Sequence, residues 1–432
     1  MINSKEKNEK NRNLRREAYL ILTEYEKEGT YLNLLLKNKL LGTGSNNAFV
    51  TELVYGVVRY KRFLDYKIEK YSSIKIKKIS LGVLVILRMG LYQLYFMDRV
   101  PDFALINESV KLCEKVQYKS KGYVNAILRK AVAEKDMEEK NISWEIKYSF
   151  SDEMFREIKS QYREKTESIL KNLNEKKPSS IRINKLKTDK EEFLSLVKNE
   201  NIYEKNGFLF LKGSIDKELY DKGFYTVQSI SSQMCVNVLN PKKNENIIDM
   251  CCAPGGKTAY IAEIMENTGK ITAFEFYEHR SLLTKKNLER LSVANAEVFC
   301  SDATEFNSIY ENTADKILCD VPCSGWGVIG GKPDIKWREE NVAELIEIQK
   351  KILFNASKYV KKGGTIVYST CTINKNENEN VINSFLEENK NFELSEFSVL
   401  SDDGEIKTDG ILQILPDETK IGFFIAKLHR KE

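Results

Sequence analysis

Histidine is scarce in this sequence, with only His279 and His429 among 432 residues. Its eight cysteines form no Cys-x-x-Cys module, the pattern on which most structural zinc sites depend. We therefore expect no metal centre. The cysteines are Cys113, Cys235, Cys251, Cys252, Cys300, Cys319, Cys323 and Cys371.

Long apolar runs are also missing. The longest, residues 81–97, is interrupted by Arg88, Gly90 and Gln93, and it falls short of the roughly 20 residues that span a bilayer. We expect it to form a buried helix. The N-terminal residues are polar and include no apolar leader, which together with the cysteine pattern predicts a reducing, cytoplasmic location.

The charge is distributed unevenly along the chain. Residues 1–150 contain 28 lysines and arginines against 18 acidic residues, a net +10, whereas residues 151–432 contain 40 against 45, a net −5. The total length suits two to three domains. A basic N-terminal third favours an acidic polymer as its partner, although charge runs are often only a solvated surface.

That N-terminal third is predicted to be entirely helical. Apolar residues recur at three- and four-residue spacing from Leu14 to Tyr25, and again in residues 47–60, 63–71, 81–97, 103–113 and 122–131. We expect the following basic residues on outer faces of these helices: Arg12, Arg15, Arg16, Arg59, Lys61, Arg62, Lys75, Lys77, Lys78, Lys119, Lys121, Arg129 and Lys130.

Residues 134–140 are nearly all charged and are typical of a linker. A mixed pattern follows, with one helical segment at 152–173, a helix at 190–198 and short strands near 180–184 and 207–211. This predicts a small α+β domain over residues 146–225. Arg182, in the first of these strands, would meet phosphate or face water.

From about residue 225, β-branched runs alternate with helical ones, which indicates a parallel sheet covered by helices on its faces. The expected strands are 246–250, 270–274, 296–300, 316–320 and 364–369, and the helices between them include 258–266, 280–291 and 342–360. Ligands of such α/β sheets bind at the carboxyl ends of the strands.

The loop after the first of these strands has the features of a cofactor site. It contains adjacent glycines, Gly255 and Gly256, directly before a helix, where the backbone can approach a ligand. Glu275 ends the next strand about 20 residues later, at the place of an acid that binds ribose hydroxyls, and Asp302 follows the third strand. A Gly-x-Gly-x-x-Gly dinucleotide motif and a Walker loop are both absent. The pattern predicts an adenosine ligand, with a plain tight turn as the alternative.

Two cysteines follow later strands of the same sheet. Cys323 lies after Asp320 in Asp-Val-Pro-Cys, and Cys371 follows Ser369 and Thr370. Carbon 5 of cytosine is a poor nucleophile, and a thiolate that adds to carbon 6 makes it reactive toward a sulfonium methyl group. A carboxyl group at nitrogen 3 stabilises the charge that arises. From the residues alone the two cysteines are interchangeable, and a buried structural role remains the alternative for each.

Three motifs carry a resemblance to a known family. They are Cys251-Cys252-Ala253-Pro254-Gly255-Gly256-Lys257-Thr258, Asp320-Val321-Pro322-Cys323-Ser324-Gly325 and Ser369-Thr370-Cys371-Thr372-Ile373-Asn374. The chain resembles the RNA cytosine-C5 methyltransferases of the Sun type, also called Fmu or RsmB, which act on 16S ribosomal RNA. Residues 12–129 resemble the NusB-type RNA-binding helical domain that marks this subfamily.

The resemblance implies three domains: a NusB-like helical domain at 1–135, a small α+β RNA-binding domain at 146–225, and a Rossmann-like methyltransferase domain at 226–432. It implies S-adenosylmethionine as cofactor, ribosomal RNA as partner, and a monomer that binds neither DNA nor membrane. Cys251, Cys252, Ala253, Pro254, Gly255, Gly256 and Lys257 would hold the methionine part, Glu275 the ribose and Asp302 the adenine. Glu275 stands where Asp is usual.

The resemblance also assigns the catalytic residues. Cys371 would be the nucleophile and Cys323 the cysteine that assists product release. Asp320 would contact the cytosine ring and border the cofactor, with Lys257 nearby. Three alternatives stay open: methylation of another RNA such as tRNA, a non-catalytic RNA-binding or antitermination factor, and an amino-group methyltransferase. The last would need Pro-Pro-aromatic after the fourth strand, where this chain has Pro322-Cys323.

Overall fold

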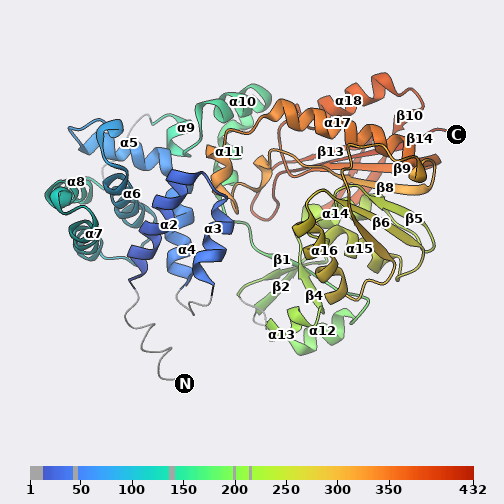
Figure 1. Ribbon diagram of the computed structural model, residues 1–432, viewed down its shortest axis with the longest axis horizontal. Coiled ribbons are helices and arrows are strands. Elements are labelled where there is room, and N and C mark those ends of the chain that lie inside the picture. The colour runs from blue at the N-terminus through green and yellow to red at the C-terminus, as the bar shows by residue number, and fades with distance from the viewer. Residues whose placement is uncertain (1–12, 42–46, 136–141, 198–200, 214–216) are drawn as a thin grey trace. The chain divides into compact units, whose positions relative to one another are not determined.

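The computed structural model describes residues 13–41, 47–135, 142–197, 201–213 and 217–432. They form two compact units (Figure 1). The first comprises the described residues up to Asn174 together with Gly331–Glu339, and the second comprises the rest. Within the described residues, no helix is both long and apolar enough to cross a membrane.

The first unit is helical throughout. Its helices are α2 (Leu14–Glu28), α3 (Leu32–Leu40), α4 (Asn47–Arg59), α5 (Lys61–Tyr71), α6 (Leu81–Phe96), α7 (Asp102–Val116), α8 (Lys121–Ala133), α9 (Trp144–Lys147), α10 (Asp152–Tyr162) and α11 (Thr166–Asn174). The six helices expected up to residue 131 are all present. Helix α3 was not predicted, because Leu34, Leu35 and Leu36 are consecutive and give no helical spacing.

Helix α6 contacts α2, α4, α5, α7 and α8 and is the centre of the apolar core. This confirms that the run at 81–97 is a buried helix. Its charged residue, Arg88, is only 4% exposed, and its guanidinium pairs with Asp65 (2.6 Å) and Glu26 (3.0 Å). These carboxylates supply the partners without which a buried charge would be strongly unfavourable.

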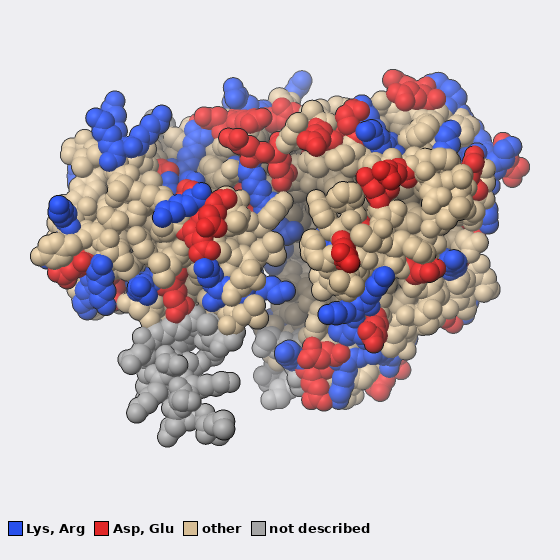
Figure 2. Space-filling model, viewed as in Figure 1, with Lys and Arg blue, Asp and Glu red and all other residues tan. Residues whose placement is uncertain are grey.

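Most of the basic residues of this unit that were expected on outer faces are at least partly exposed. In the view of Figure 2, blue basic side chains are interspersed with red acidic ones over this unit. Arg59 is an exception: it is buried, because the last turn of α4 packs against a segment from later in the chain, η7 (Pro333–Trp337). Arg12 and part of the predicted linker lie outside the described residues.

The segment Gly331–Glu339 belongs to the first unit although its neighbours in sequence belong to the second. Lys336 anchors it. Its side chain is buried, and Nζ donates to the carbonyl oxygens of Arg59 (3.0 Å), Tyr148 (3.1 Å) and Ser149 (2.9 Å), and to Asn174 Oδ1. Trp337 Nε1 adds a bond to the carbonyl of Val58 (2.7 Å). No sequence pattern indicates this insertion.

The second unit begins with a small antiparallel sheet of order β2-β3-β1-β4. The elements are β1 (Ser180–Ile183), α12 (Lys190–Leu196), β2 (Ile202–Lys205), β3 (Phe208–Leu211), α13 (Lys217–Asp221) and β4 (Tyr225–Val227). The helix expected at 152–173 is instead two helices, α10 and α11, that belong to the first unit. Between them the backbone turns at Arg163, whose φ of 47° is left-handed. The domain boundaries drawn from the sequence stay a prediction.

Arg182 of β1 neither faces water nor offers its guanidinium at the surface, which corrects both expectations. It is buried, and Nε donates to Gln228 Oε1 (2.8 Å) while Nη1 pairs with Glu263 of α15 (Gly256–Ile264). The arginine therefore joins the small sheet to the larger one. Burial lowers its pKa to about 10.

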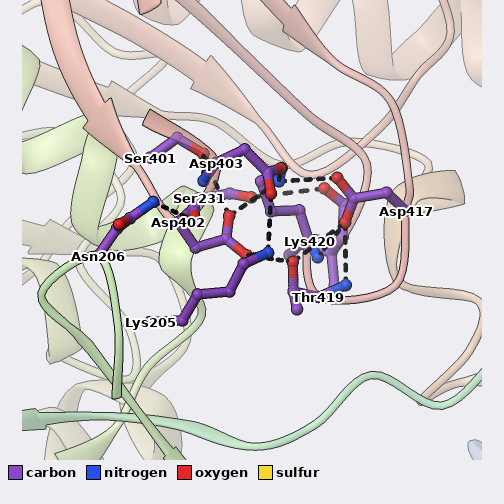
Figure 3. Close-up of polar contacts among 10 residues, drawn as sticks. Lys205, Asn206, Ser231, Ser401, Asp402, Asp403, Asp417, Thr419 and Lys420 are labelled. Carbon is purple, nitrogen blue, oxygen red and sulfur yellow. Dashed lines mark hydrogen bonds and ion pairs between the residues drawn. The ribbon is translucent and has the colours of Figure 1, made fainter. Parts of the chain in front are cut away.

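A cluster of charged residues connects the small sheet to the turn between β11 (Phe397–Ser401) and β12 (Gly404–Thr408), which form a separate two-stranded sheet (Figure 3). Lys420 Nζ pairs with Asp402 (2.8 Å), Asp417 (2.7 Å) and Asp403. Lys205, from the end of β2, also pairs with Asp403 (2.7 Å), and the neighbouring Asn206 donates to the Asp402 carbonyl (2.7 Å). Three carboxylates thus share two lysines, and these ion pairs hold the turn after β2 against the turn between β11 and β12.

The larger sheet has the order β10-β14-β9-β8-β5-β6-β7, with β13 paired to β14. The strands are β5 (Asn246–Asp249), β6 (Lys270–Glu275), β7 (Ala296–Cys300), β8 (Ala314–Asp320), β9 (Val360–Thr370), β10 (Phe392–Leu394), β13 (Ile411–Ile414) and β14 (Phe423–Arg430). The five predicted strands are all present and parallel. The sheet is nevertheless mixed, because β14 adds antiparallel to β9.

Helices cover both faces of this sheet (Figure 1). On one side lie α14 (Ile230–Leu239), α15 and α16 (Glu278–Arg290), and on the other α17 (Val342–Tyr359) and α18 (Glu379–Glu388). Neighbouring strand residues such as Ile247 and Ile248 point into opposite cores, as the two-residue period of a strand requires. Both faces are apolar, which explains the unbroken β-branched runs of the sequence.

Candidate active site

The candidate site lies where the strand order of the larger sheet reverses. Strand β5 pairs with β6 on one side and with β8 on the other. The connections that leave β5 and β8 at their carboxyl ends therefore diverge to opposite faces, and such a switch point leaves a crevice for ligands. The loop at residues 250–255, called the Cys251 loop, emerges from β5, and the loop at residues 321–325, called the Cys323 loop, emerges from β8.

The Cys251 loop is held by the last residue of β5. Asp249 is buried and accepts hydrogen bonds from the Thr258 hydroxyl (2.8 Å) and the Cys251 N–H (3.3 Å). Burial, opposed by these bonds, raises the pKa of this carboxyl to about 6. Gly255 precedes α15 with φ +93°, and a Cβ there would come within 3.0 Å of Thr284 Cγ2. Glycine is therefore required at this turn.

Lys257 and Asp320 form the central ion pair. Lys257 Nζ lies 2.6 Å from Asp320 Oδ2, and Ser369 Oγ donates to Asp320 Oδ1 (2.8 Å). Burial acts to lower the pKa of Lys257, but the Asp320 carboxylate outweighs it, and the net pKa is raised. The lysine is thus held as an ammonium. Three predicted motifs, those of Lys257, Asp320 and Ser369, are brought together here.

The thiols of Cys323 and Cys371 are in contact, with their sulfur atoms 3.3 Å apart. The hydrogen bond between them, together with burial and the nearby Glu377, raises the pKa of Cys323 well above its ordinary value. The Asp320 carboxylate and, to a smaller degree, the thiols of Cys235 and Cys371 raise the pKa of Lys257. The two cysteines thus form one hydrogen-bonded pair, with Glu377 near Cys323 and Lys257 near Cys371.

Glu377 holds the two cysteine loops together and was missed by the sequence analysis. Its buried carboxylate accepts from the Ser324 N–H (2.8 Å), the Ser324 hydroxyl and Gln349 Nε2 (3.0 Å). Burial raises its pKa. Ser324 also bonds Thr372 (2.9 Å), so the residues directly after both cysteines are linked. Glu377 lies in the run Asn374-Lys375-Asn376-Glu377-Asn378, whose polar composition resembles a surface loop and gives no signal.

The two other predicted acids occupy the expected strand ends. Glu275 ends β6, is buried, and accepts from the Tyr277 N–H (3.1 Å) while pairing with Arg280 Nη1 (3.3 Å). Asp302 follows β7 and accepts from the N–H (2.8 Å) and hydroxyl (2.7 Å) of Thr304. Arg280 also donates to the Ala253 carbonyl (3.3 Å), which connects Glu275 to the Cys251 loop.

A cavity of about 200 Å³ opens beside the central ion pair. Its lining is Val227, Gln228, Ser229, Ser232, Asp249, Cys251, Cys252, Ala253, Pro254, Gly256, Lys257 and Asp320. Most of the predicted cofactor loop thus shares one cavity with Lys257 and Asp320. Burial raises the pKa of both Cys251 and Cys252, so these two thiols pack the loop and are unsuited to act as nucleophiles.

Comparison with known families matches three segments of the chain. Residues 236–429 match the 16S rRNA methyltransferase RsmB/F family, residues 12–133 the NusB family, and residues 152–207 the ferredoxin-like domain of RsmF/B-like methyltransferases. The NusB-like helical domain, the small α+β domain and the Rossmann-like methyltransferase domain expected from the sequence are therefore confirmed as the fold. The comparison adds that the small domain is ferredoxin-like.

Relatives match over nearly the full length. The probable ribosomal RNA small subunit methyltransferase B of Bacillus subtilis (strain 168) is 34% identical, over 95% of this chain and 97% of the relative. Ribosomal RNA small subunit methyltransferase B of Escherichia coli O1:K1 / APEC is 30% identical, over 98% of this chain and 100% of the relative. The crystal structure of PH0851 aligns with a TM-score of 0.77 at 25% identity, over 97% of this chain and 99% of that protein. NSun6 from Pyrococcus horikoshii, solved with SFG, shares the fold over 66% of this chain and 99% of that protein (TM-score 0.57, 23% identity). The chain belongs to the ribosomal RNA small subunit methyltransferase B family, whose members are S-adenosylmethionine-dependent cytosine-C5 methyltransferases.

Proposed function

We propose that this protein transfers a methyl group from S-adenosylmethionine to carbon 5 of one cytosine in 16S ribosomal RNA, through a covalent bond between Cys371 and the base. The observation that carries the proposal is the contact between two thiols beside the Lys257–Asp320 ion pair, at the switch point of a methyltransferase sheet. Because the proposed substrate is a ribosomal RNA, the protein would act in the cytoplasm, where ribosomes assemble.

The residues of the crevice suit an adenosine cofactor with a carboxylate at its other end. Helix α15 has Gly255 as its N-cap residue and so has no side-chain cap, which leaves its first N–H groups available to an anion. Cys251–Lys257 would hold the methionine part, Glu275 the ribose hydroxyls and Asp302 the adenine amino group, with Asp320 beside them. The cofactor supplies an electrophilic methyl group.

Cys371 acts as the nucleophile: its thiolate forms a bond to carbon 6 of the cytosine, and the electron pair of the 5,6 double bond moves to carbon 5. Carbon 5 would then take the methyl group as the bond between that group and the sulfonium sulfur breaks, with S-adenosylhomocysteine as the leaving group. Asp320 stabilises the base at nitrogen 3, and Lys257 keeps the charge of Asp320 balanced. Cys323 then assists loss of the carbon 5 proton. The sulfur–carbon 6 bond breaks as the double bond re-forms, which returns Cys371 as a thiolate.

The electrostatics of the two thiols support this assignment. A thiolate is stabilised by a nearby cation and destabilised by a nearby anion. Cys371 interacts with the Lys257 ammonium, whereas Cys323 faces Glu377 and keeps its proton. A protonated Cys323 can donate a hydrogen bond to a thiolate at Cys371. Once that thiolate has bonded carbon 6, the largest cause of the raised pKa of Cys323 is gone, and Cys323 must lose its proton before it can take the one on carbon 5.

Recognition of RNA would involve the basic helical unit and the small sheet, through phosphate contacts. The target base must be unpaired or flipped out to reach Cys371. We expect the protein to act as a monomer. Deletion of residues 1–135 should weaken binding to 16S ribosomal RNA, and unchanged binding would contradict this role for the helical domain.

Replacement of Cys371 by alanine tests the nucleophile. The variant should bind RNA normally but transfer no labelled methyl group to 16S ribosomal RNA, and tRNA serves as the competing substrate. Cys113→Ala, a buried cysteine of the first unit, is the matched control and should keep its activity. Full activity of C371A would refute the assignment, and preferential labelling of tRNA would refute the substrate.

Replacement of Cys323 by alanine tests product release. The covalent step should proceed and release should slow, so a protein–RNA adduct is expected on a denaturing gel. The double variant C323A/C371A should form none. An active, adduct-free C323A protein would mean that Cys323 is structural. Bisulfite sequencing of ribosomal RNA from cells with and without the gene would identify the base.

A further inference from the structure

Gln228, outside the three signature motifs, has a feature that the proposed chemistry does not use. The residue is 7% exposed, and its side-chain nitrogen Nε2 is buried without a hydrogen-bond partner among the described residues. A buried amide donor without an acceptor is unfavourable by about 1–3 kcal/mol. Natural proteins retain such groups where a ligand supplies the missing partner.

The orientation of the amide is fixed by its neighbours. Arg182 Nε donates to Gln228 Oε1 (2.8 Å), and an arginine cannot accept a bond from the amide nitrogen, so the NH₂ group must point away from Arg182. The backbone of Gln228 is held as well: its N–H donates to the Ser180 carbonyl (3.1 Å), and its carbonyl accepts from Ser180 Oγ (2.8 Å) and Gln233 Nε2 (3.0 Å).

The nitrogen faces the start of helix α15. Gln228 lines the cavity that contains Gly256, Lys257 and Asp320, and Nε2 lies 3.9 Å from where a Cβ on Gly256 would stand. Helix α15 is nine residues long, and its first N–H groups have no side-chain cap. A side-chain donor therefore joins the positive end of a helix and the Lys257 ammonium around one small space, which is the donor set of a carboxylate site.

We infer that Gln228 binds the carboxylate at the methionine end of S-adenosylmethionine and is a binding residue for the cofactor. The inference rests on the proposed function. A carboxylate is favoured over an RNA phosphate because six of the twelve lining residues belong to the Cys251–Lys257 loop, to which the methionine part is assigned. Arg182 acts as a positioning residue, since it sets which end of the amide faces the cavity.

The test measures binding by calorimetry on the full chain, without RNA, for two ligands. S-adenosylhomocysteine carries the carboxylate, and 5′-methylthioadenosine lacks it. Gln228→Leu removes the donor, whereas Gln228→Glu keeps a partner for Arg182 and sets a negative charge against the ligand. Both substitutions should weaken the binding of S-adenosylhomocysteine at least tenfold, as expected for the loss of one charge-assisted hydrogen bond. Q228E should weaken it more than Q228L does. Binding of 5′-methylthioadenosine should stay within twofold.

Gln93→Leu, in helix α6 of the first unit, is the matched control. Gln93 is also buried and its Oε1 also accepts from an arginine, Arg15 Nε (2.8 Å), but its Nε2 already donates to the Met89 carbonyl (2.9 Å). Neither ligand should therefore bind more weakly to this variant. Unchanged binding of S-adenosylhomocysteine to folded Q228L and Q228E would overturn the inference. An equal loss for both ligands would also overturn it, since the effect would then be on the loop, as would a loss confined to RNA affinity. Failure of the unmodified protein to bind S-adenosylhomocysteine would instead contradict the proposed function.

Discussion

Lys336 offers a sharp test of how the first unit is held together. It lies in a segment that the chain inserts after the Cys323 loop, and it is 1% exposed. Its ammonium contacts four oxygen acceptors and lies 4.0 Å from the centre of the Phe150 ring. Lys336→Met keeps the length of the apolar stem and removes only the charged donor, so it isolates the contribution of these polar contacts.

The expected cost follows from the acceptors that lose their donor. The Tyr148 carbonyl retains a bond from Asn174 Nδ2 (2.7 Å) and loses little. The Ser149 carbonyl and Asn174 Oδ1 are more affected, and each buried acceptor that loses its donor costs about 1–3 kcal/mol. Relief of the buried ammonium's desolvation offsets part of the loss. We expect K336M to lower the stability of the first unit by about 3 kcal/mol.

The assay is hydrogen exchange of the full chain followed by peptide mass spectrometry, because two units need not unfold together. Slowly exchanging amides of α4 and α5 should exchange about 100-fold faster in K336M, while those of β5 and β6 keep their rates. Lys332→Met, an exposed lysine of the same segment, is the control and should change stability by less than about 0.5 kcal/mol. Equal exchange in K336M and K332M would refute the anchoring role.

Two further predictions concern the active site. The pKa of Asp249 is about 6 in the folded protein because of burial, against 3.8 normally, so the folded state retains a proton that the unfolded chain releases and stability falls as the pH rises through this window. The stability of the wild type relative to Asp249→Asn should therefore fall by about 2–3 kcal/mol from pH 4 to pH 7 in urea titrations, and a constant difference would contradict the raised pKa. Glu377→Gln leaves one accepting oxygen for three donors, so methyl transfer should fall at least tenfold, whereas Glu387→Gln, on the exposed face of α18, should have no effect. Equal activity of the two variants would show that Glu377 does not position the cysteine loops.

The parts of the site that the sequence predicted are those that strand order determines. Parallel strands end at one edge of a sheet, so acids and cysteines that follow successive strands are bound to meet there. Asp320 and Lys257 illustrate this: they are 63 residues apart, yet β8, which ends at Asp320, is the neighbour of β5, which precedes Lys257, and their side chains pair at 2.6 Å. Glu275 and Asp302 occupy their strand ends for the same reason.

The parts that the sequence did not predict depend on contacts without a local pattern. Glu377 is buried within a polar run, and only the folded chain shows that Ser324 and Gln349 surround it. Lys336 is a lysine in a short polar segment, which sequence reasoning assigns to the surface. The antiparallel strand β14 was missed because its apolar run is buried on both faces. It therefore lacks the alternation of apolar and polar residues that is typical of a half-buried antiparallel strand.

The ranking of the two thiols shows what the fold adds to the motifs. Both cysteines follow a strand of the same sheet, and their sulfur atoms are in contact, so proximity to the base cannot distinguish them. The charged neighbours of the two cysteines can distinguish them. An ammonium favours a thiolate nearby and a carboxylate disfavours one, because Coulomb energies between close unit charges are about 1 kcal/mol or more even in water. Lys257 favours a thiolate at Cys371, and Glu377 disfavours one at Cys323. On the proposed function, the cation that pairs with Asp320 would therefore favour attack by the Cys371 sulfur, and the Cys323 sulfur would take part in proton transfer.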